Sequence, residues 1–322
     1  MPSSLRDSLK SLLRRLLDES VVRLVEYITR RVLARSLELQ ELQLQVRLFE
    51  TVERLKKMLQ ATTPDNPALH GYKVYSQTDE DGIVENILER VERTTRLSKT
   101  FIEIGCGNGL ENNSHYLLLK GFRGCWCDSS EKNIAFIEQH LGGLAFQQLL
   151  VVQRFVDGQN VRDLIEQFTT FLSDKEPDFC SLDIDGNDLA VLREILAICR
   201  PKTICVEYNA KFPPPVSLAM EYGPSYVWKA NDYQGATLQT ICNLLRDYVL
   251  VCCNLSGANA FFVRCDLSGH FERYSIADLY QPARYFLIHL SAGHPPTLRW
   301  ARQKVRTATD VSPENDGRSK LE

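Results

Sequence analysis

The stretch that decides the fold is Thr100–Leu110, which reads TFIEIGCGNGL. It opens with an apolar run of branched and aromatic residues, as in a strand buried inside a parallel sheet. Gly105, Gly107 and Gly109 follow directly, and residues 111–114 then supply Asn and Ser, which favour helix N-termini. This order of strand, glycine turn and helix start lets backbone amides approach a ligand closely. The sequence therefore predicts an α/β domain with a binding loop at this turn.

The spacing of the glycines separates two classes of cofactor. A dinucleotide fingerprint requires Gly-x-Gly-x-x-Gly, and Leu110 stands where the third glycine should be. This argues against a nicotinamide-dependent oxidoreductase. With Glu103 before it, the Gly-x-Gly-x-Gly pattern resembles motif I of class I S-adenosylmethionine (SAM) methyltransferases. An ordinary tight turn explains the glycines equally well, so the flanking chain has to decide.

Composition limits the class of protein. The 322 residues suffice for one sizeable α/β domain with extensions, and 38 basic against 41 acidic residues give no overall charge that would attract a nucleic acid. Most of the ten cysteines lie in apolar runs without a Cys-x-x-Cys pair, which is typical of buried free thiols in a reducing compartment. Charges interrupt the apolar N-terminus, unlike a signal peptide or a membrane span. We therefore expect a cytoplasmic protein.

Residues 1–60 are expected to form a helical arm, because residues 5–60 contain neither Gly nor Pro. Apolar residues recur three and four positions apart, with Arg35 interrupting the series and a change of phase at Leu17–Ser20. Our first interpretation is a coiled coil that makes a homo-oligomer, and the second is a cap on the main domain. An excess of Lys and Arg in residues 1–35 makes attraction to a membrane surface a weaker third.

The segment before the glycine motif offers one cofactor candidate. Residues 61–70 carry two prolines and are expected to link the arm to the main domain. Ser76 and Asp79 can form a capping box for the helix that follows, which leaves Gln77 without a structural reason. Because a helix before the first strand commonly covers the cofactor in such folds, Gln77 is a candidate cofactor contact.

The next two strands end beside acidic residues. Asp128 ends the second strand, where a carboxylate can accept both ribose hydroxyls of an adenosine bound over the glycines. Val156 and Asp157 end the third strand, where they are placed to pack on the adenine and to accept from its amine. The alternatives are that Asp128 caps the next helix and that Asp157 belongs to an ordinary Asp-Gly turn.

Two carboxylates follow in the fourth strand, within residues 179–188, FCSLDIDGND. Strand alternation points Asp183 and Asp185 to the same side, and their repulsion costs free energy unless a cation, a donor or a proton relieves it. Turn chemistry explains residues 186–188 but not Asp183. We therefore place Asp183 in the cofactor site.

The fifth strand, residues 203–209, is expected to bring Glu207 and Asn209 to the same edge. Asp185, Glu207 and Asn209 are oxygen ligands of the kind that Mg²⁺ or Mn²⁺ prefers. The alternative is that Glu207 and Asn209 hydrogen-bond the proline-rich loop that follows. The aromatic residues beyond that loop suit either the wall of a substrate pocket or ordinary core packing: Tyr222, Tyr226, Trp228 and Tyr233.

Two last strands, at 248–253 and 260–264, are expected to close the sheet as an antiparallel pair. Over about residues 70–267 the chain resembles the FkbM-like family of class I SAM-dependent methyltransferases. The motifs are Ser76-Gln77 through Glu80-Asp81-Gly82, Asp183–Asp188, Glu207–Asn209 and Asn259–Arg264. The resemblance implies a Rossmann-like, mostly parallel sheet of seven strands, SAM as cofactor, and methyl transfer to oxygen, often in surface-glycan or secondary-metabolite biosynthesis.

The chemistry that this implies assigns roles to the candidates. Since the SAM sulfonium is already activated, the protein must mainly align the acceptor and activate its hydroxyl. Asp185 is our candidate for that role, as general base or metal ligand, with Glu207 and Asn209 in support; His115 and His289 are weaker alternatives. The cofactor-binding candidates are Gln77, Glu103, Gly105, Gly107, Gly109, Asp128, Val156, Asp157 and Asp183.

The expected organisation has five parts. A helical arm at 1–60 and a linker at 61–70 precede a methyltransferase domain at 71–267, which is followed by a C-terminal helical extension at 268–300 and a disordered tail at 301–322. A small molecule or glycan is the expected acceptor, and no residue identifies it. A non-catalytic scaffold that works through its arm stays open as the alternative.

Overall fold

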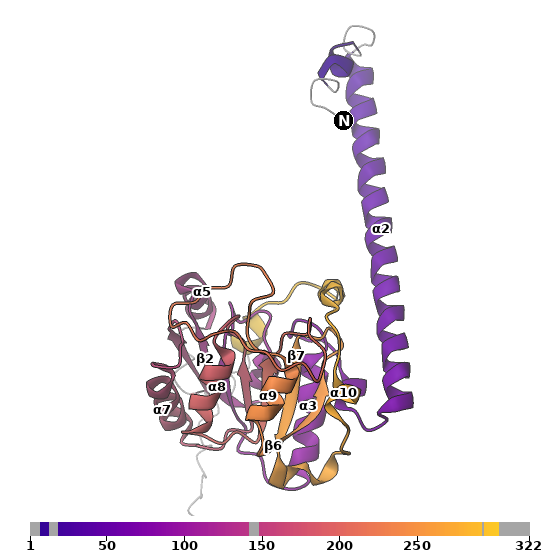
Figure 1. Cartoon of the computed structure of the whole chain (residues 1–322). Helices are drawn as coiled ribbons and strands as arrows, with labels where there is room; N and C mark the ends of the chain where they lie inside the picture. Colours follow the sequence, from indigo (N-terminus) through magenta and orange to yellow (C-terminus); the bar gives the residue numbers. More distant parts are fainter. Residues whose placement is uncertain (1–6, 13–18, 142–147, 292, 303–322) are drawn as a thin grey trace, which may run out of the picture. The chain divides into compact units, whose positions relative to one another are not determined.

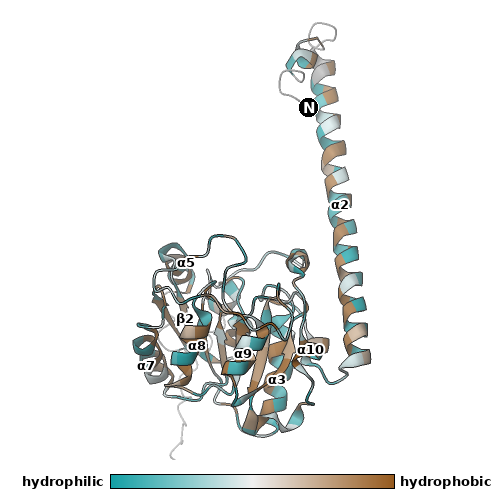
Figure 2. Ribbon diagram, in the orientation of Figure 1, coloured by the Kyte–Doolittle hydropathy of each residue, from teal (hydrophilic) through white to brown (hydrophobic). Residues whose placement is uncertain are grey.

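The computed structural model describes residues 7–12, 19–141, 148–291 and 293–302, and the chain divides into two compact units, Met1–Val52 and Glu53–Glu322. Residues 7–12 and the long helix α2, Glu19–Thr62, confirm the expected helix of the arm. Most of the expected phase change at Leu17–Ser20 lies outside the described residues. Apolar side chains lie on several sides of α2, so that apolar and polar colours alternate along it in Figure 2.

The second unit is built on a seven-stranded sheet, with the order β3-β2-β1-β4-β5-β7-β6 (Figure 1). Strands β1 to β5 are parallel, and β7 runs antiparallel between β5 and β6. The predicted Rossmann-like sheet is confirmed. Its strands are β1 (Thr100–Ile104), β2 (Arg123–Asp128), β3 (Leu149–Gln153), β4 (Phe179–Leu182), β5 (Thr203–Glu207), β6 (Tyr248–Cys253) and β7 (Asn259–Arg264).

Helices cover the sheet because its parallel strands are apolar on both faces. Three of them, α7, α8 and α9, share one buried core with the strands, for example with Ile102, Cys180 and Ile204. The helices of this unit are α3 (Glu80–Glu92), α4 (His115–Leu119), α5 (Glu131–Leu141), α7 (Val161–Leu172), α8 (Asp188–Leu196), α9 (Leu238–Leu244) and α10 (Ile276–Leu279), with 3-10 turns η1 (Pro67–His70), η2 (Cys265–His270) and η3 (Tyr285–His289).

The ten cysteines are all free, as expected.

In the described part of the chain, no helix combines the length and apolar character that crossing a bilayer requires.

The C-terminal extension is not the helix that the sequence predicts. Within the described residues of this segment, helical structure is confined to the end of η2, to the short α10 and η3, and to residues 299–302, and residues 280–284 between α10 and η3 have no regular structure. Ser275 starts α10 through a capping box with Asp278, but Pro282 cannot continue a helix because it lacks an amide hydrogen.

Strands β1 and β4 approach each other most closely where the glycine loop leaves the sheet. Gly105 has a φ of +90°, and a Cβ atom there would lie 1.6 Å from the backbone oxygen of Asp183. The amide of Asp183 donates to the oxygen of Ile104 at 3.0 Å, and the amide of Gly105 donates to Cys127 at 2.8 Å. Glycine is therefore required at position 105 by both its φ and its surroundings.

Gly107 provides a matched comparison for a test of this requirement. Its φ is +56°, but no atom lies within 4 Å of a Cβ placed there. Gly107→Ala should lower the free energy of unfolding by about 1–2 kcal/mol, the ordinary cost of a left-handed residue. Gly105→Ala should cost more than about 4 kcal/mol, because β1 and β4 must separate. Urea unfolding measures both, and equal losses would contradict this account of the loop.

Candidate functional site

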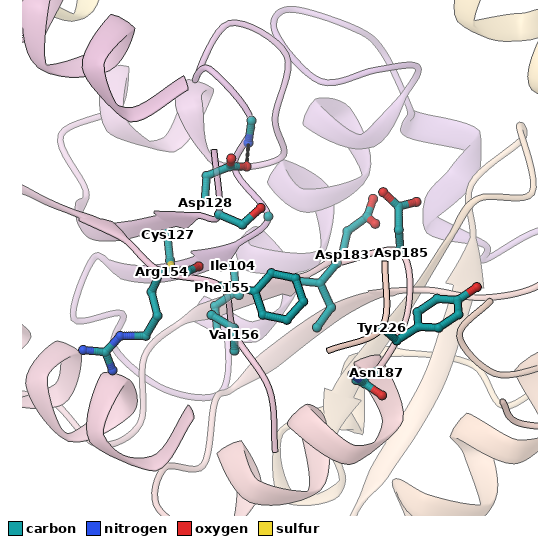
Figure 3. A pocket seen from close by; sticks show the side chains of 14 residues that line it. Ile104, Cys127, Asp128, Arg154, Phe155, Val156, Asp183, Asp185, Asn187 and Tyr226 are labelled. Carbon is teal, nitrogen blue, oxygen red and sulfur yellow. Dashed lines mark hydrogen bonds between the residues drawn. The ribbon is translucent and has the colours of Figure 1, made fainter. Parts of the chain in front are cut away.

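A cavity of about 280 Å³ opens at the carboxyl ends of β1 to β4 (Figure 3). In open α/β sheets ligands bind where the strand order reverses, and here β1 has β2 on one side and β4 on the other. One end of the cavity is formed by the glycine loop and Asp128, and the other by Asp183, Asp185 and Tyr226. The site therefore lies at the position that the fold favours for a ligand.

The glycine loop contributes two of the three predicted glycines. Gly105 and Gly107 line the cavity. Gly109 does not, because it packs on Trp126, where a Cβ atom would lie 2.9 Å from ring atom Cζ3. The structure thus gives Gly109 a packing role and does not bring it to the cavity lining.

Asp128 lines the cavity and organises two loops. Its Oδ2 accepts from the amide of Gly107 at 2.9 Å, and its Oδ1 accepts from Ser130 N at 2.8 Å and Asn133 Nδ2 at 3.1 Å. The bond to Gly107 is drawn in Figure 3. Ser130 itself caps α5, since its Oγ accepts from Asn133 N at 3.3 Å, so Asp128 supports the cap from the preceding turn. A carboxylate has about four acceptor sites, which leaves Asp128 an open position at the cavity.

The end of β3 adds an aromatic ring that the sequence analysis missed. Val156 lines the cavity as predicted, and beside it Phe155 is 42% exposed with its ring in the cavity. An aromatic residue near the end of the predicted third strand was the available signal. Asp157 instead belongs to a local turn, because its Oδ1 accepts from the backbone amides of Gln159 and Asn160 at 2.8 and 2.9 Å.

Glu103 anchors the loop from beneath and does not line the cavity. Its carboxylate accepts from the amides of Asn113 and Ser114 at 2.8 and 3.1 Å, and from the Ser114 hydroxyl. Burial raises the pKa of Glu103 to about 7. The structure therefore does not bring Glu103 to the cavity lining, and its carboxylate supplies the acceptors for the start of α4.

Gln77 is exposed and lies outside the cavity lining, so the structure does not bring it to the other candidates.

The capping box expected from Ser76 and Asp79 is also absent from α3. Asp81 takes its place: its Oδ2 accepts from the Ser76 amide and hydroxyl at 2.8 and 2.9 Å. Asp81 sits in the first turn of α3, where it also accepts from the amides of Val74 and Tyr75.

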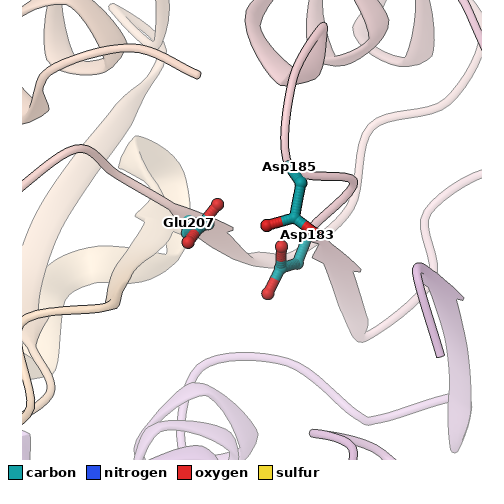
Figure 4. A group of neighbouring side chains, drawn as sticks. All are labelled: Asp183, Asp185 and Glu207. Carbon is teal, nitrogen blue, oxygen red and sulfur yellow. The ribbon is translucent and has the colours of Figure 1, made fainter. Parts of the chain in front are cut away.

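Three carboxylates gather at the other end of the cavity. Oxygens of Asp183, Asp185 and Glu207 all lie within 4.8 Å of one another (Figure 4), and we call these residues the acid group. Burial first, and then repulsion from neighbouring carboxylates, raises the pKa of Asp183 and of Glu207, while burial raises that of Asp185. Asp185 also has a φ of +56°, which is uncommon outside glycine and marks a constrained turn.

Asn209 does not share in this group. Its Nδ2 donates to the backbone oxygens of Asp232 and Gln234 at 2.8 and 3.2 Å, and its Oδ1 accepts from Lys211 N at 3.3 Å. Of the ligand set expected at Asp185, Glu207 and Asn209, the structure brings the two carboxylates together and adds Asp183, while the Asn209 amide is hydrogen-bonded to the loop. The reason is that β5 ends at Glu207, so strand alternation does not continue to position 209.

The two histidines lie outside the cavity lining. His115 is buried under Tyr75, with ring centroids 3.7 Å apart, and burial lowers its pKa to about 4. His289 belongs to η3. Neither residue is placed as a base for the cavity.

Fold and site together define the class. A parallel sheet closed by an antiparallel β7 between β5 and β6, with a glycine loop after β1 and an acid at the end of β2, is the arrangement of class I SAM-dependent methyltransferases. Residues 72–224 match the model of the methyltransferase FkbM domain. This matched part, a little under half of the chain, is an FkbM methyltransferase domain.

Solved structures show similarity at low identity. Magnesium protoporphyrin IX methyltransferase (ChlM) from Synechocystis PCC 6803, with bound SAH, is 13% identical over 56% of this chain and 81% of its own, with a TM-score of 0.36. An O-methyltransferase from Bacillus cereus in complex with SAH is 14% identical over 67% of this chain and 89% of its own, with a TM-score of 0.36. No curated protein matches the chain in sequence.

Proposed function

We propose that the chain transfers a methyl group from SAM to a hydroxyl oxygen of a small molecule or glycan. The observation that carries this proposal is one cavity with the glycine loop and Asp128 at one end and the acid group at the other. The first end suits an adenosine, and the second end suits a hydroxyl that must lose its proton. A non-catalytic scaffold would need neither the acids nor their connection to the loop.

The residues present fit SAM by their chemistry. The free space at Gly107 admits a ligand against the backbone, Asp128 offers acceptors for a ribose diol, and Phe155 and Val156 offer apolar surface for an adenine. When bound there, SAM would supply an already activated methyl group. The protein's own task is then to hold the acceptor oxygen in line and keep it deprotonated.

The acid group supports proton removal in one of two ways. Burial alone raises the pKa of Asp185, whereas neighbouring carboxylates raise the pKa of Asp183 and Glu207 further. A carboxyl with a raised pKa suits a general base near neutral pH. Three carboxylates in such proximity also form an oxygen ligand set for Mg²⁺ or Mn²⁺, which would lower the pKa of a bound hydroxyl. A metal titration separates the two.

Substitution of Asp128 tests the cofactor end. Asp128→Ala should weaken binding of SAM by about 10- to 100-fold, because hydrogen bonds to a charged group contribute about 1.5–3 kcal/mol. Asp157→Asn is the matched control and should leave the affinity unchanged, because Asp157 serves its own turn. Calorimetry measures both. Tight binding of NAD without binding of SAM would contradict the proposal.

Substitution at the acid end tests the metal. If Mn²⁺ binds the acid group, Asp185→Asn should weaken the affinity for Mn²⁺ by about tenfold or more, because one of three charged ligands is lost. The affinity for SAM should stay the same. Asn209→Ala should leave Mn²⁺ binding unchanged, because that amide holds a loop. Electron paramagnetic resonance of Mn²⁺ measures both. Wild-type protein that binds no Mn²⁺ would leave Asp185 as a general base.

We further propose that the protein is cytoplasmic, in keeping with its free thiols, and that the arm self-associates. Twelve apolar residues between Leu24 and Phe49 are 46–64% exposed, among them Leu39 and Leu42. Exposed apolar surface of this extent marks an interaction site, and a second copy of the helix would cover part of it.

Charges placed on the arm test the self-association. Leu39→Glu with Leu42→Glu should convert an oligomer into a monomer in light scattering, because both side chains would carry charge into the helix contact. Gln40→Glu with Gln43→Glu adds the same charge at polar positions and should leave the mass unchanged. A monomeric wild-type chain at all concentrations would contradict self-association.

A further inference from the structure

The arm carries one apolar stripe with a strict spacing. Helix α2 is continuous from Glu19 to Thr62 (Figure 1), so residues three and four apart share a face of it. The stripe, which we call the seam, consists of seven apolar residues and one arginine: Val25, Ile28, Val32, Arg35, Leu39, Leu42, Val46 and Phe49. The seven apolar side chains are between 47% and 61% exposed, so no other part of the described chain buries them.

The spacing of the seam is symmetric. From Val25 to Phe49 its residues follow at intervals of three, four, three, four, three, four and three, which read the same in both directions. A second copy that runs antiparallel therefore matches the seam layer by layer, with Val25 opposite Phe49 and Val32 opposite Leu42. A parallel copy also matches, with each residue opposite itself. Spacing alone thus allows both directions, and the charges have to separate them.

A parallel copy would oppose like charges. It would place the two Arg35 side chains in the same layer, where their guanidinium groups repel each other. The residues that flank the seam would not offset this repulsion. Glu38 would lie beside Gln43 of the second copy, and Arg31 beside Ser36, and neither pair attracts by charge.

An antiparallel copy separates the two arginines and brings opposite charges together. Arg35 then faces Leu39 of the second copy, and the two Arg35 residues are about 6 Å apart along the axis. Within one arm the Arg35 guanidinium contacts the Glu38 carboxylate at 3.2 Å, and both side chains are exposed, at 74% and 65%. Glu38 of the second copy is offset from Arg35 by one residue along the axis. Two guanidinium groups and two carboxylates therefore gather at the centre of the seam.

We infer that the arm binds a second copy of itself in the antiparallel direction, with Val25 opposite Phe49, and that Arg35 selects this direction. The apolar stem of Arg35 would lie along the seam with its guanidinium at the edge. A polar residue in a seam lowers the stability of the pair but specifies its arrangement. Other exposed apolar residues of the arm, such as Leu33 and Leu37, take no part in this contact. This inference rests on the proposed self-association of the arm.

Disulfide cross-linking of the full chain tests the direction. Cys265→Ser first removes the exposed thiol. In this background, chains with Val25→Cys and tagged chains with Phe49→Cys are co-expressed and oxidised. They should cross-link to each other, because facing seam residues lie within reach of a disulfide, and neither variant alone should cross-link to itself. Val32→Cys with Leu42→Cys should give the same result in the same register.

Two comparisons make the test specific. Val25→Cys with Val32→Cys should give no product, since these positions are about 26 Å apart along the axis in the antiparallel register. Arg35→Leu should raise the self-cross-linking of Val25→Cys chains from background by about fivefold, because the repulsion that opposes the parallel direction is lost. Arg35→Lys keeps the charge and should leave it at background.

Each result bears on a separate part of the inference. Self-cross-linking of Val25→Cys chains without product in the mixed pair would show parallel arms and overturn it, as would an oligomer in which neither mixed pair cross-links. If Arg35→Leu chains still cross-link only in the mixed pair, Arg35 does not select the direction. A wild-type chain that is monomeric in light scattering contradicts the proposed self-association itself.

Discussion

The backbone contact between β1 and β4 is the constraint on which the site depends. With no side chain at Gly105, the loop after β1 can pass beside the backbone oxygen of Asp183. The same contact sets where the glycine loop turns toward β2 and where the chain after β4 begins to bend. Asp128 then holds Gly107 from one side, and Glu103 holds the start of α4 from beneath. A backbone contact thus fixes the loop relative to the acids, and the side chains of Asp128 and Glu103 hold the loop further.

At the acid end the protein maintains an unfavourable concentration of charge. Burial first, and then the neighbouring carboxylates, raises the pKa values of Asp183 and Glu207, and this repulsion must be relieved by protons, by a cation or by a ligand. Such arrangements are characteristic of functional sites, where the free energy is recovered on binding. Two asparagines hold the aromatic loop beside these acids. Asn187, after β4, and Asn209, after β5, donate to backbone oxygens of the loop at Gly223 and Asp232.

Sequence reasoning recovered what depends on periodicity and on strand ends. The sheet, the glycine loop, Asp128 and the meeting of Asp185 with Glu207 all follow from the rule that parallel strands present their carboxyl ends at one edge. Sequence reasoning could not choose between the two possible uses of a polar residue, a ligand contact or a local hydrogen bond. Glu103 and Asp157 satisfy local backbone amides, and only the actual course of the loop decides between that use and a ligand. The prediction that Asn209 shares a face with Glu207 depends on where β5 ends, and the end of a strand cannot be read from composition to within two residues.

One ligand is expected to lie across the ends of β1, β2, β3 and β4, and hydrogen–deuterium exchange with and without S-adenosylhomocysteine (SAH) tests this directly. Amides at residues 105–110, 128–133, 153–157 and 183–188 should all exchange more slowly when SAH is bound, because one ligand covers and orders these four segments together. The turn between β6 and β7, residues 254–258, should exchange at the same rate in both states. Protection confined to that turn, or absent from all four strand ends, would contradict the account.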